Sequence, residues 1–262
     1  FEEEAGNLNL GSQSGFLDDG VTALQRLSLE APIHAWSSSE QMLAIDSLFR
    51  AGHQLGSGDS RPAIDETFDV AIQIHESAVE NACATVLAGR TLNEKKLDEL
   101  LGEIGRGNED AAANVDGDKQ GESADEEPFE IVFSQLRPIV FEARDQVLRV
   151  GVRGRRFTKG KRVLQKALEV TANYKPTKLD DGTVVLKRDG KVQVDFGGKK
   201  LSISEAGMKP VIEKSFGKVF PDVILDQAIK VADDAQMESL QGMEFRPQLV
   251  QADGGWLTIA IR

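Results

Sequence analysis

The sequence predicts an α+β protein in which a highly curved antiparallel meander wraps on, or packs against, two to three amphipathic helices. Over much of residues 129–200, apolar and polar residues alternate with the two-residue period of strands. Asp-Gly pairs at 180–182 and 189–190 separate these runs, as in antiparallel hairpins, because Asp-Gly tolerates positive φ. Apolar residues with helical spacing precede and follow the meander. With 262 residues the chain is long enough to bury a core.

Residues 1–105 form the first part of the predicted fold, an acidic region with helices and one or two strands. We expect a short strand near 27–33. The sequence Ser37-Ser-Ser-Glu40 then has the pattern of a capping box, in which hydroxyl and carboxylate bind the free amides at a helix start. The residues that keep helical spacing behind it are Met42, Ile45, Leu48 and Phe49. This helix is expected to end near 52–56.

A strand is expected to run directly into a helix within residues 68–87. The residues that alternate as in a strand are Phe68, Val70, Ile72 and Ile74, and those that share one helix face are Val79, Ala82, Cys83, Val86 and Leu87. Ser77 is the expected N-cap, and Glu76 complements the positive end of the helix dipole. A second capping box, Thr91-Leu-Asn-Glu94, predicts another helix. Its apolar stripe consists of Leu97, Leu100, Leu101 and Ile104.

Residues 106–128 have the composition of a linker. They hold eight acidic and two basic residues and no aromatic residue. Such a segment buries too little apolar surface to fold, so a solvated, disordered linker is expected, with an acidic docking tail as the alternative. The part that follows, residues 129–262, is β-rich with one helix, and we expect it to form one continuous fold with residues 1–105.

Strands are expected throughout the meander. Their ranges are 129–141, interrupted by Pro138, then 148–157, 164–174, 183–188 and 192–196.

Beyond the meander, the sequence predicts a second strand-to-helix junction and a closing hairpin. A short strand, Leu201–Ile203, leads into an amphipathic helix that Ser204 can cap. The apolar face of this helix contains Met208, Val211, Ile212 and Phe216. A β or mixed segment begins at Val223, residues 232–242 read as a loop, and 245–250 pairs with 256–261.

The two predicted junctions match in residue type. Ile74-His-Glu-Ser-Ala-Val79 corresponds to Ile203-Ser-Glu-Ala-Gly-Met208, with isoleucine, glutamate and a large apolar residue at equivalent positions. Together with the meander, this layout resembles the tubular lipid-binding superfamily, which includes the bactericidal permeability-increasing proteins, and is similar to AsmA-like bacterial envelope proteins. The resemblance implies a bent antiparallel sheet wrapped around a helix, a bound lipid, and a periplasmic or secreted location in preference to a cytoplasmic one.

Charge and cysteine content limit the function classes. Residues 1–128 carry 8 basic and 26 acidic residues, whereas residues 129–262 carry 23 and 17, and the net charge is −12. This balance argues against a dedicated nucleic-acid binder. No apolar run approaches the roughly 20 residues of a membrane-spanning helix. The single cysteine, Cys83, allows no intrachain disulfide and is expected to be a buried small apolar residue.

The leading hypothesis is a non-enzymatic envelope protein that binds a lipid or another apolar small molecule between sheet and helix. The residues expected to line such a cavity are Phe133, Val150, Val152, Leu168, Val170, Val194, Val211, Ile212 and Phe216. The same residues could fill a closed core, since sequence does not distinguish a full core from an empty one. The alternative hypothesis is a structural or protein–protein interaction module with a protein partner and no cavity.

The densest basic stretch lies between residues 149 and 166. Arg149, Arg153 and Arg155 share strand parity, and Lys159 and Lys161 add charge near a turn. These five residues are candidate contacts for an anionic surface, either lipid headgroups or the chain's own acidic half. A solvated outer face of the sheet is the alternative.

Catalytic motifs are absent from the sequence. There is no nucleophile elbow, phosphate loop or Cys/His cluster, and the three histidines lack metal-ligand spacing, so no cofactor is expected. His75-Glu76 is the candidate for a general base, and a polar cap at the sheet edge is the alternative interpretation.

Overall fold

The computed structural model describes residues 33–38, 43–47, 60–64, 68–97, 128–198, 201–226, 228–230 and 244–261. Within these ranges the protein is mostly antiparallel sheet with a few helices, as the sequence predicts, and the largest sheet is open. The predicted linker lies outside the described residues except for Pro128, and so does the predicted loop at 232–242.

The largest sheet has nine strands and is built around β7 (Val147–Lys159). Two strands lie end to end along each edge of β7. β6 (Ile139–Arg144) and β5 (Phe129–Phe133) occupy one edge, and β9 (Leu168–Lys178) and β8 (Arg162–Leu164) occupy the other. The predicted strands of this region are therefore present, and Pro138 falls in the break between β5 and β6.

Four short strands complete this sheet. β10 (Val184–Arg188) and β11 (Gln193–Asp195) lie end to end along β9, β12 (Val223–Ile224) pairs with β10, and β4 (Thr91–Asn93) pairs with β5. The prediction of a hairpin turn at 189–190 is wrong, because β10 and β11 both pair with β9 and not with each other.

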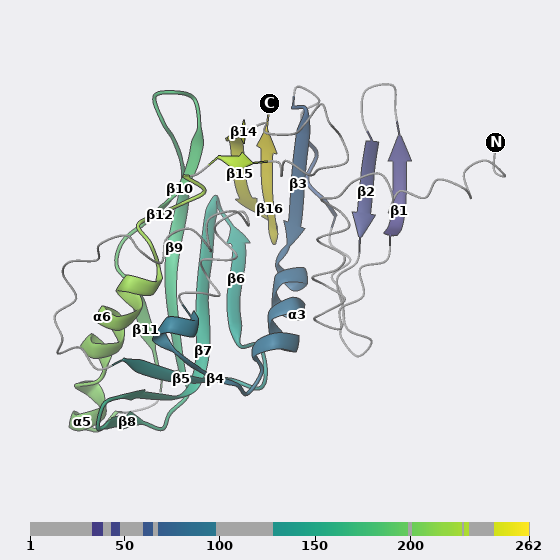
Figure 1. Ribbon diagram of the computed structural model, residues 1–262. Coiled ribbons are helices and arrows are strands. Elements are labelled where there is room, and N and C mark those ends of the chain that lie inside the picture. Colours follow the sequence, from purple (N-terminus) through teal and green to yellow (C-terminus); the bar gives the residue numbers. More distant parts are fainter. Residues whose placement is uncertain are drawn as a thin grey trace.

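A β-bulge at Arg155 divides β7 into two halves. Val132 pairs with Arg156 and Phe133 pairs with Gly154, so Arg155 is the extra residue of β7. Figure 1 shows β6 and β9 running upright while β5 and β8 run across the lower part of the view, so the two halves of β7 have partners of different direction. Gly154 is needed beside the bulge, because a Cβ there would lie 2.9 Å from the Ile131 side chain.

A three-stranded sheet joins a strand that precedes residues 106–128 to the last two strands of the described chain. β16 (Trp256–Ile261) pairs with β15 (Pro247–Asp253) on one edge and with β3 (Val70–His75) on the other. Two backbone hydrogen bonds attach this sheet to the β6–β7 turn: the Gln146 amide donates to Ala252 at 2.9 Å, and the Gly255 amide donates to Ala143 at 2.8 Å. In each of these two sheets, a strand that precedes residues 106–128 thus pairs with a strand that follows them: β3 with β16, and β4 with β5.

The helices lie over different parts of the larger sheet (Figure 1). α6 (Lys209–Val219) packs beside β11, and α3 (Glu76–Leu87) packs beside β6. Phe216 of α6 inserts into an aromatic cluster, with its ring centroid 5.0 Å from that of Phe129 and 6.3 Å from that of Phe157. The described part also contains α5 (Ile203–Ala206), a helical turn at 94–97, and the pair β13 (Ile229–Lys230) and β14 (Glu244–Phe245).

The prediction of a helix after Ser37 is wrong. Two strands occupy the described part of this segment, and β1 (Ile33–Ser38) pairs antiparallel with β2 (Leu43–Ser47). Leu43 and Ile45 also alternate as in a strand, so a run this short fits either period, and the cross-strand pairing decides between them. The predicted strand near 27–33 overlaps β1 only at Ile33, and its other residues lie outside the described ranges.

The prediction of a second strand-to-helix junction is also wrong. Ile203 is the first residue of α5 and not the end of a strand, so the proposed correspondence with Ile74 does not exist. Ser202, and not Ser204, caps α5: its hydroxyl accepts the Glu205 amide, and the Glu205 carboxylate accepts the Ser202 amide at 2.8 Å. The capping box displaces the expected strand because it satisfies these amides locally.

Two other caps differ from expectation for the same reason. His75, and not Ser77, is the N-cap of α3. Thr91 lies in β4, and the next helical turn starts at Glu94, where the Asn93 side chain accepts the Lys96 amide at 2.9 Å. The predicted strand at 68–74 extends one residue further, to His75, and a strand that was not predicted, β4, occupies the start of the predicted helix. Each strand ends at a side chain that caps the following turn. The rest of the helix predicted over 97–104 lies outside the described residues.

Candidate functional site

Eight of the nine residues expected to line a cavity lie in or against one hydrophobic cluster. Phe133, Val152, Leu168, Val170, Val194, Ile212 and Phe216 are buried members of a single hydrophobic cluster, and Val150 packs against it half-buried. Val211 is half-buried on α6. The structure therefore brings eight of these residues together in one packed cluster.

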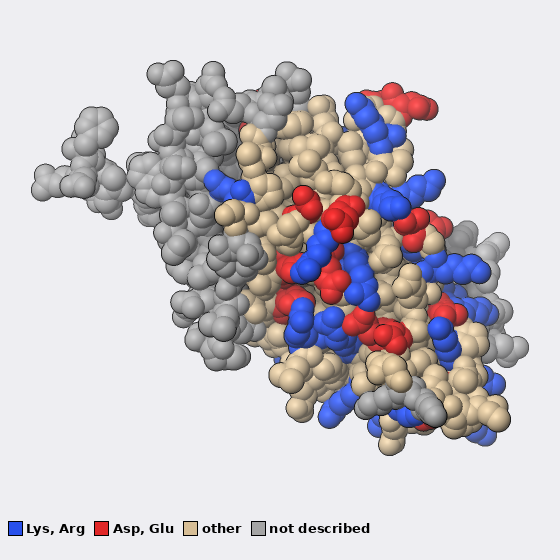
Figure 2. Space-filling view, turned by 180° about the vertical axis from the view of Figure 1, so that it is seen from behind, with Lys and Arg blue, Asp and Glu red and all other residues tan. Residues whose placement is uncertain are grey.

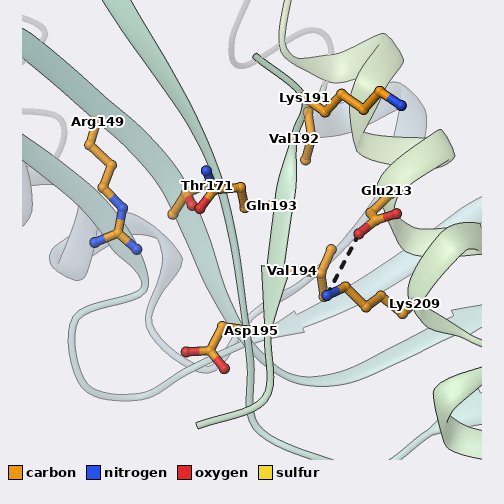
Figure 3. A pocket seen from close by; sticks show the side chains of 9 residues that line it. All are labelled: Arg149, Thr171, Lys191, Val192, Gln193, Val194, Asp195, Lys209 and Glu213. Carbon is orange, nitrogen blue, oxygen red and sulfur yellow. Dashed lines mark ion pairs between the residues drawn. The ribbon is translucent and has the colours of Figure 1, made fainter. Parts of the chain in front are cut away.

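A groove of about 580 Å³ opens beside the edge strand β11, and its lining is mainly polar. Figure 3 shows Arg149 on one side of β11 and Lys191, Lys209 and Glu213 on the other. The remaining lining residues are Thr171, Val192, Gln193, Val194 and Asp195. Of the predicted cavity residues, Val194 contributes to this groove, so it is not the apolar site expected from the sequence.

Most charges of this groove are already bound within the protein. The Arg149 guanidinium donates to Glu142 at 3.0 Å and also contacts Glu169. Lys209 lies 4.0 Å from Glu213 on α6, and Asp195 accepts the backbone amide of Gly197 at 3.0 Å. The groove thus presents few charged groups that a ligand could engage without displacing an internal partner.

A charged network covers the sheet face away from the core. Arg149 and Arg153 lie two residues either side of Gly151 on β7, and both contact the Glu169 carboxylate of β9, Arg153 at 2.8 Å. Gly151 allows this arrangement, because a Cβ there would lie 2.6 Å from the Thr171 methyl group. Figure 2 shows basic and acidic side chains interleaved at the centre of this face. Arg149 and Arg153 are therefore neutralised and do not form a bare basic surface.

The other three predicted basic residues separate. Arg155 is exposed at the bulge, so it does not keep the parity of Arg149 and Arg153. Lys159 turns toward α6, where its ammonium donates to the buried Ser215 hydroxyl at 3.1 Å. Lys161 is exposed at the β7–β8 turn. Only Arg155 and Lys161 of the five remain available to an anionic partner.

Arg155 and Lys161 belong to a larger set that we name the basic end: Arg90, Lys96, Arg155, Arg156, Lys161 and Arg162. All six are exposed, and none forms an ion pair in the described structure. Strand pairing brings them together, because Thr91 pairs with Val132 and Val132 pairs with Arg156. The carboxylates of the same segments are Glu94 and Glu130, so basic residues predominate.

The arginines of the basic end contrast with most other arginines of the described surface. The arginines that pair with carboxylates elsewhere are Arg137, Arg144, Arg149, Arg153, Arg188 and Arg246. Arg156 and Arg162 fall within the basic stretch at 149–166, whereas sequence reasoning missed Arg90 and Lys96. No local signal could have found these two, because they precede β5 by more than thirty residues and reach it only through the β4–β5 pairing.

His75 and Glu76 form a tightly built junction between β3 and α3. The Ser77 amide donates to His75 Nδ1 at 3.1 Å, and the Ser77 hydroxyl lies 2.9 Å from the same atom. Since a backbone amide can only donate, Nδ1 must be the unprotonated acceptor of the ring. The Glu76 carboxylate pairs with Arg144 at 3.0 Å.

The other side of the histidine ring is packed by the β15–β16 turn. The Trp256 ring meets the His75 ring edge-on at 4.9 Å, and Gly255 accepts the Glu76 amide at 2.8 Å. A Ser–His contact is also the geometry of a nucleophile and its base. Here the same nitrogen caps a helix and the ring is only 9% exposed, so we interpret the junction as a structural cap.

No group of three or more histidine, cysteine, aspartate or glutamate side chains is placed to hold a metal within the described ranges. None of the helices in that part of the chain is both long and apolar enough to cross a membrane. Comparisons with protein-family models, with curated proteins and with solved structures gave no match, so the site must be interpreted from its own geometry.

Proposed function

We propose that this chain is a non-enzymatic binding protein that recognises an anionic macromolecular surface through its basic end. The observation that carries the proposal is the set of six exposed cations without an ion-pair partner, in a protein whose other described arginines mostly pair with carboxylates. Unpaired cations on neighbouring strands create a local positive potential, which attracts anionic partners and fixes their orientation.

The net charge of −12 does not oppose this role. Charges further away than the Debye length, about 8 Å at physiological ionic strength, are largely screened. The potential at the basic end therefore depends on its own cations and on the few carboxylates beside them. Uneven charge also orients the protein, because the acidic parts are repelled by the surface that attracts the basic end.

In this proposal the apolar cluster contributes to binding by holding the strands of the basic end rigid. The β7 bulge gives the two halves of that strand partners of different direction, and Phe216 holds α6 against Phe129 and Phe157. A packed core of this kind keeps the strands that carry the basic end rigid, which limits the conformational entropy lost on binding. The lipid-binding character expected from the sequence then resides at a surface and not in a lumen.

Binding to soluble polyanions tests the proposal. We expect the protein to bind heparin and polyglutamate, with an affinity that falls as salt is raised. The triple variant Arg156→Gln, Lys161→Gln, Arg162→Gln should bind several-fold more weakly.

The matched control is the triple variant Lys178→Gln, Lys187→Gln, Lys191→Gln. It removes the same charge from exposed positions on β9, β10 and the segment before β11. Equal loss of binding in both variants would show a response to net charge alone and would refute the proposal. Absence of salt-sensitive binding to either polyanion and to anionic vesicles would refute it too.

A further inference from the structure

We infer that the anionic partner of the basic end is the headgroup surface of a phospholipid membrane; this inference rests on the proposed function. It depends on two large apolar side chains that the fold exposes beside the cations. Val163 of β8 is 52% exposed, and Ile203 of α5 is 95% exposed. A solvated basic face has no need of such residues, whereas a membrane interface accepts both kinds of side chain.

Val163 lies on the same sheet face as a cation of the basic end. It pairs across the β7–β8 hairpin with Thr158, and Arg156 precedes Thr158 by two residues on β7. Residues two apart on a strand point to the same face, so Arg156 is a diagonal neighbour of Val163. Lys161 and Arg162 immediately precede Val163 in the chain. Val163 thus has Arg156 beside it on its own sheet face, while Lys161 lies in the adjoining turn and Arg162 points to the opposite face.

Ile203 lies at the same end of the molecule. The Lys166 ammonium, which follows β8, binds the Glu205 carboxylate of α5 at 2.9 Å and so joins the two segments. This contact, with the Ser202 amide and hydroxyl, lowers the pKa of Glu205 to about 2. The attachment is therefore charged under all ordinary conditions. Figure 1 shows α5 and β8 next to each other at the lower edge of the molecule.

This placement suits a flat and extended partner. A membrane can contact only a part of a protein that lies at its periphery, and α5 and β8 form such an edge (Figure 1). Cations at the edge would contact lipid phosphates and acidic headgroups, while Val163 and Ile203 would enter the boundary with the acyl chains. An acidic protein segment would engage the cations as well, but it would leave Ile203, on a short separate helix, without a defined contact.

Sedimentation with lipid vesicles tests the inference on the full chain. We expect binding to vesicles of phosphatidylcholine mixed with phosphatidylserine and much weaker binding to phosphatidylcholine alone. The double variant Val163→Asn, Ile203→Ser keeps every charge, and it should bind the mixed vesicles about tenfold more weakly because it loses apolar insertion. Its binding to polyglutamate should be unchanged.

Leu179→Ser is the matched control, because Leu179 is 44% exposed in the β9–β10 connection, and neither strand carries a residue of the basic end. It should bind vesicles like the unmodified protein. Salt-sensitive binding to heparin or polyglutamate without binding to mixed vesicles would overturn this inference and leave the proposed function standing. Equal binding to both kinds of vesicle, or an unchanged double variant, would also overturn it. Failure with every probe would refute both proposals.

Discussion

Replacing Phe216 with alanine should destabilise the protein strongly. The side chain is 0% exposed, and its ring centroid lies 5.0 Å from that of Phe129 and 6.0 Å from that of Phe220. Removing a buried phenyl group loses its transfer free energy and leaves a cavity, which together cost about 3–5 kcal/mol. At roughly 2–4 °C per kcal/mol for a protein of this size, the melting temperature should fall by about 6–20 °C.

This substitution separates a closed core from a ligand lumen. If Phe216 lined a hollow, alanine would enlarge the hollow and the protein would lose less than about 1 kcal/mol, because no packed neighbour would be deprived of contacts. Urea denaturation followed by circular dichroism measures the change in free energy of unfolding. Val211→Ala on the same helix is the control, since Val211 is only half-buried. A loss for Phe216→Ala no larger than that for Val211→Ala would refute the packed-core interpretation.

Other predictions test particular contacts. Gly255→Ala should lower the free energy of unfolding by about 2–4 kcal/mol, because Gly255 has a left-handed φ and an added Cβ would lie 2.9 Å from the His75 ring. Gly254→Ala should cost only about 1–2 kcal/mol, because Gly254 has a φ of 56° but open space around it. Equal losses of stability in thermal melts would contradict the contact with His75. Burial raises the pKa of Tyr174 to about 12, so its phenolate absorbance, which reports the only tyrosine, should develop near that pH in the folded protein and near 10 in urea. Because the pKa of Tyr174 is raised in the folded protein, the contribution of this residue to stability is complete below pH 10 and is lost as pH rises toward 12. Identical titration curves for the folded and the urea-unfolded protein would disprove the burial of Tyr174. Cys83 is half-buried and not fully buried as expected. Partial burial and the nearby Glu80 raise the pKa of its thiol to about 11, so thiol reagents should label it about 100-fold more slowly in native than in unfolded protein at mildly alkaline pH. Equal labelling rates would contradict this protection.

The strand-to-helix junction at 70–87 shows where local patterns suffice. The change of period from two residues to 3.6 lies in the sequence itself, and the structure places β3 and α3 where the periods change. The identity of the cap was missed because histidine is not among the usual capping residues. Its ring is fixed from outside the segment, by Trp256 and Gly255, which follow it by some 180 residues.

Residues 43–47 and 201–206 show where local patterns fail. Both segments are short, and their few apolar residues fit a helix as well as a strand. Pairing with Ile33–Ser38 makes the first a strand, and a capping box at Ser202 makes the second a helix. In each case backbone hydrogen bonds to a particular partner outweigh the weak preference of the side chains.

By itself, the sequence determined the α+β class, most strands of the meander, helix α6 and the residues that pack against one another, since alternation and helical spacing require only near neighbours. Only the tertiary structure decided which cations are available. Glu142 and Glu169 reach Arg149 and Arg153 across strands, Ser215 takes up Lys159, and β4 carries Arg90 and Lys96 to the end of β7. Electrostatic interactions act through space, so the state of a charge depends on residues that chain folding brings beside it and that no local window of sequence contains.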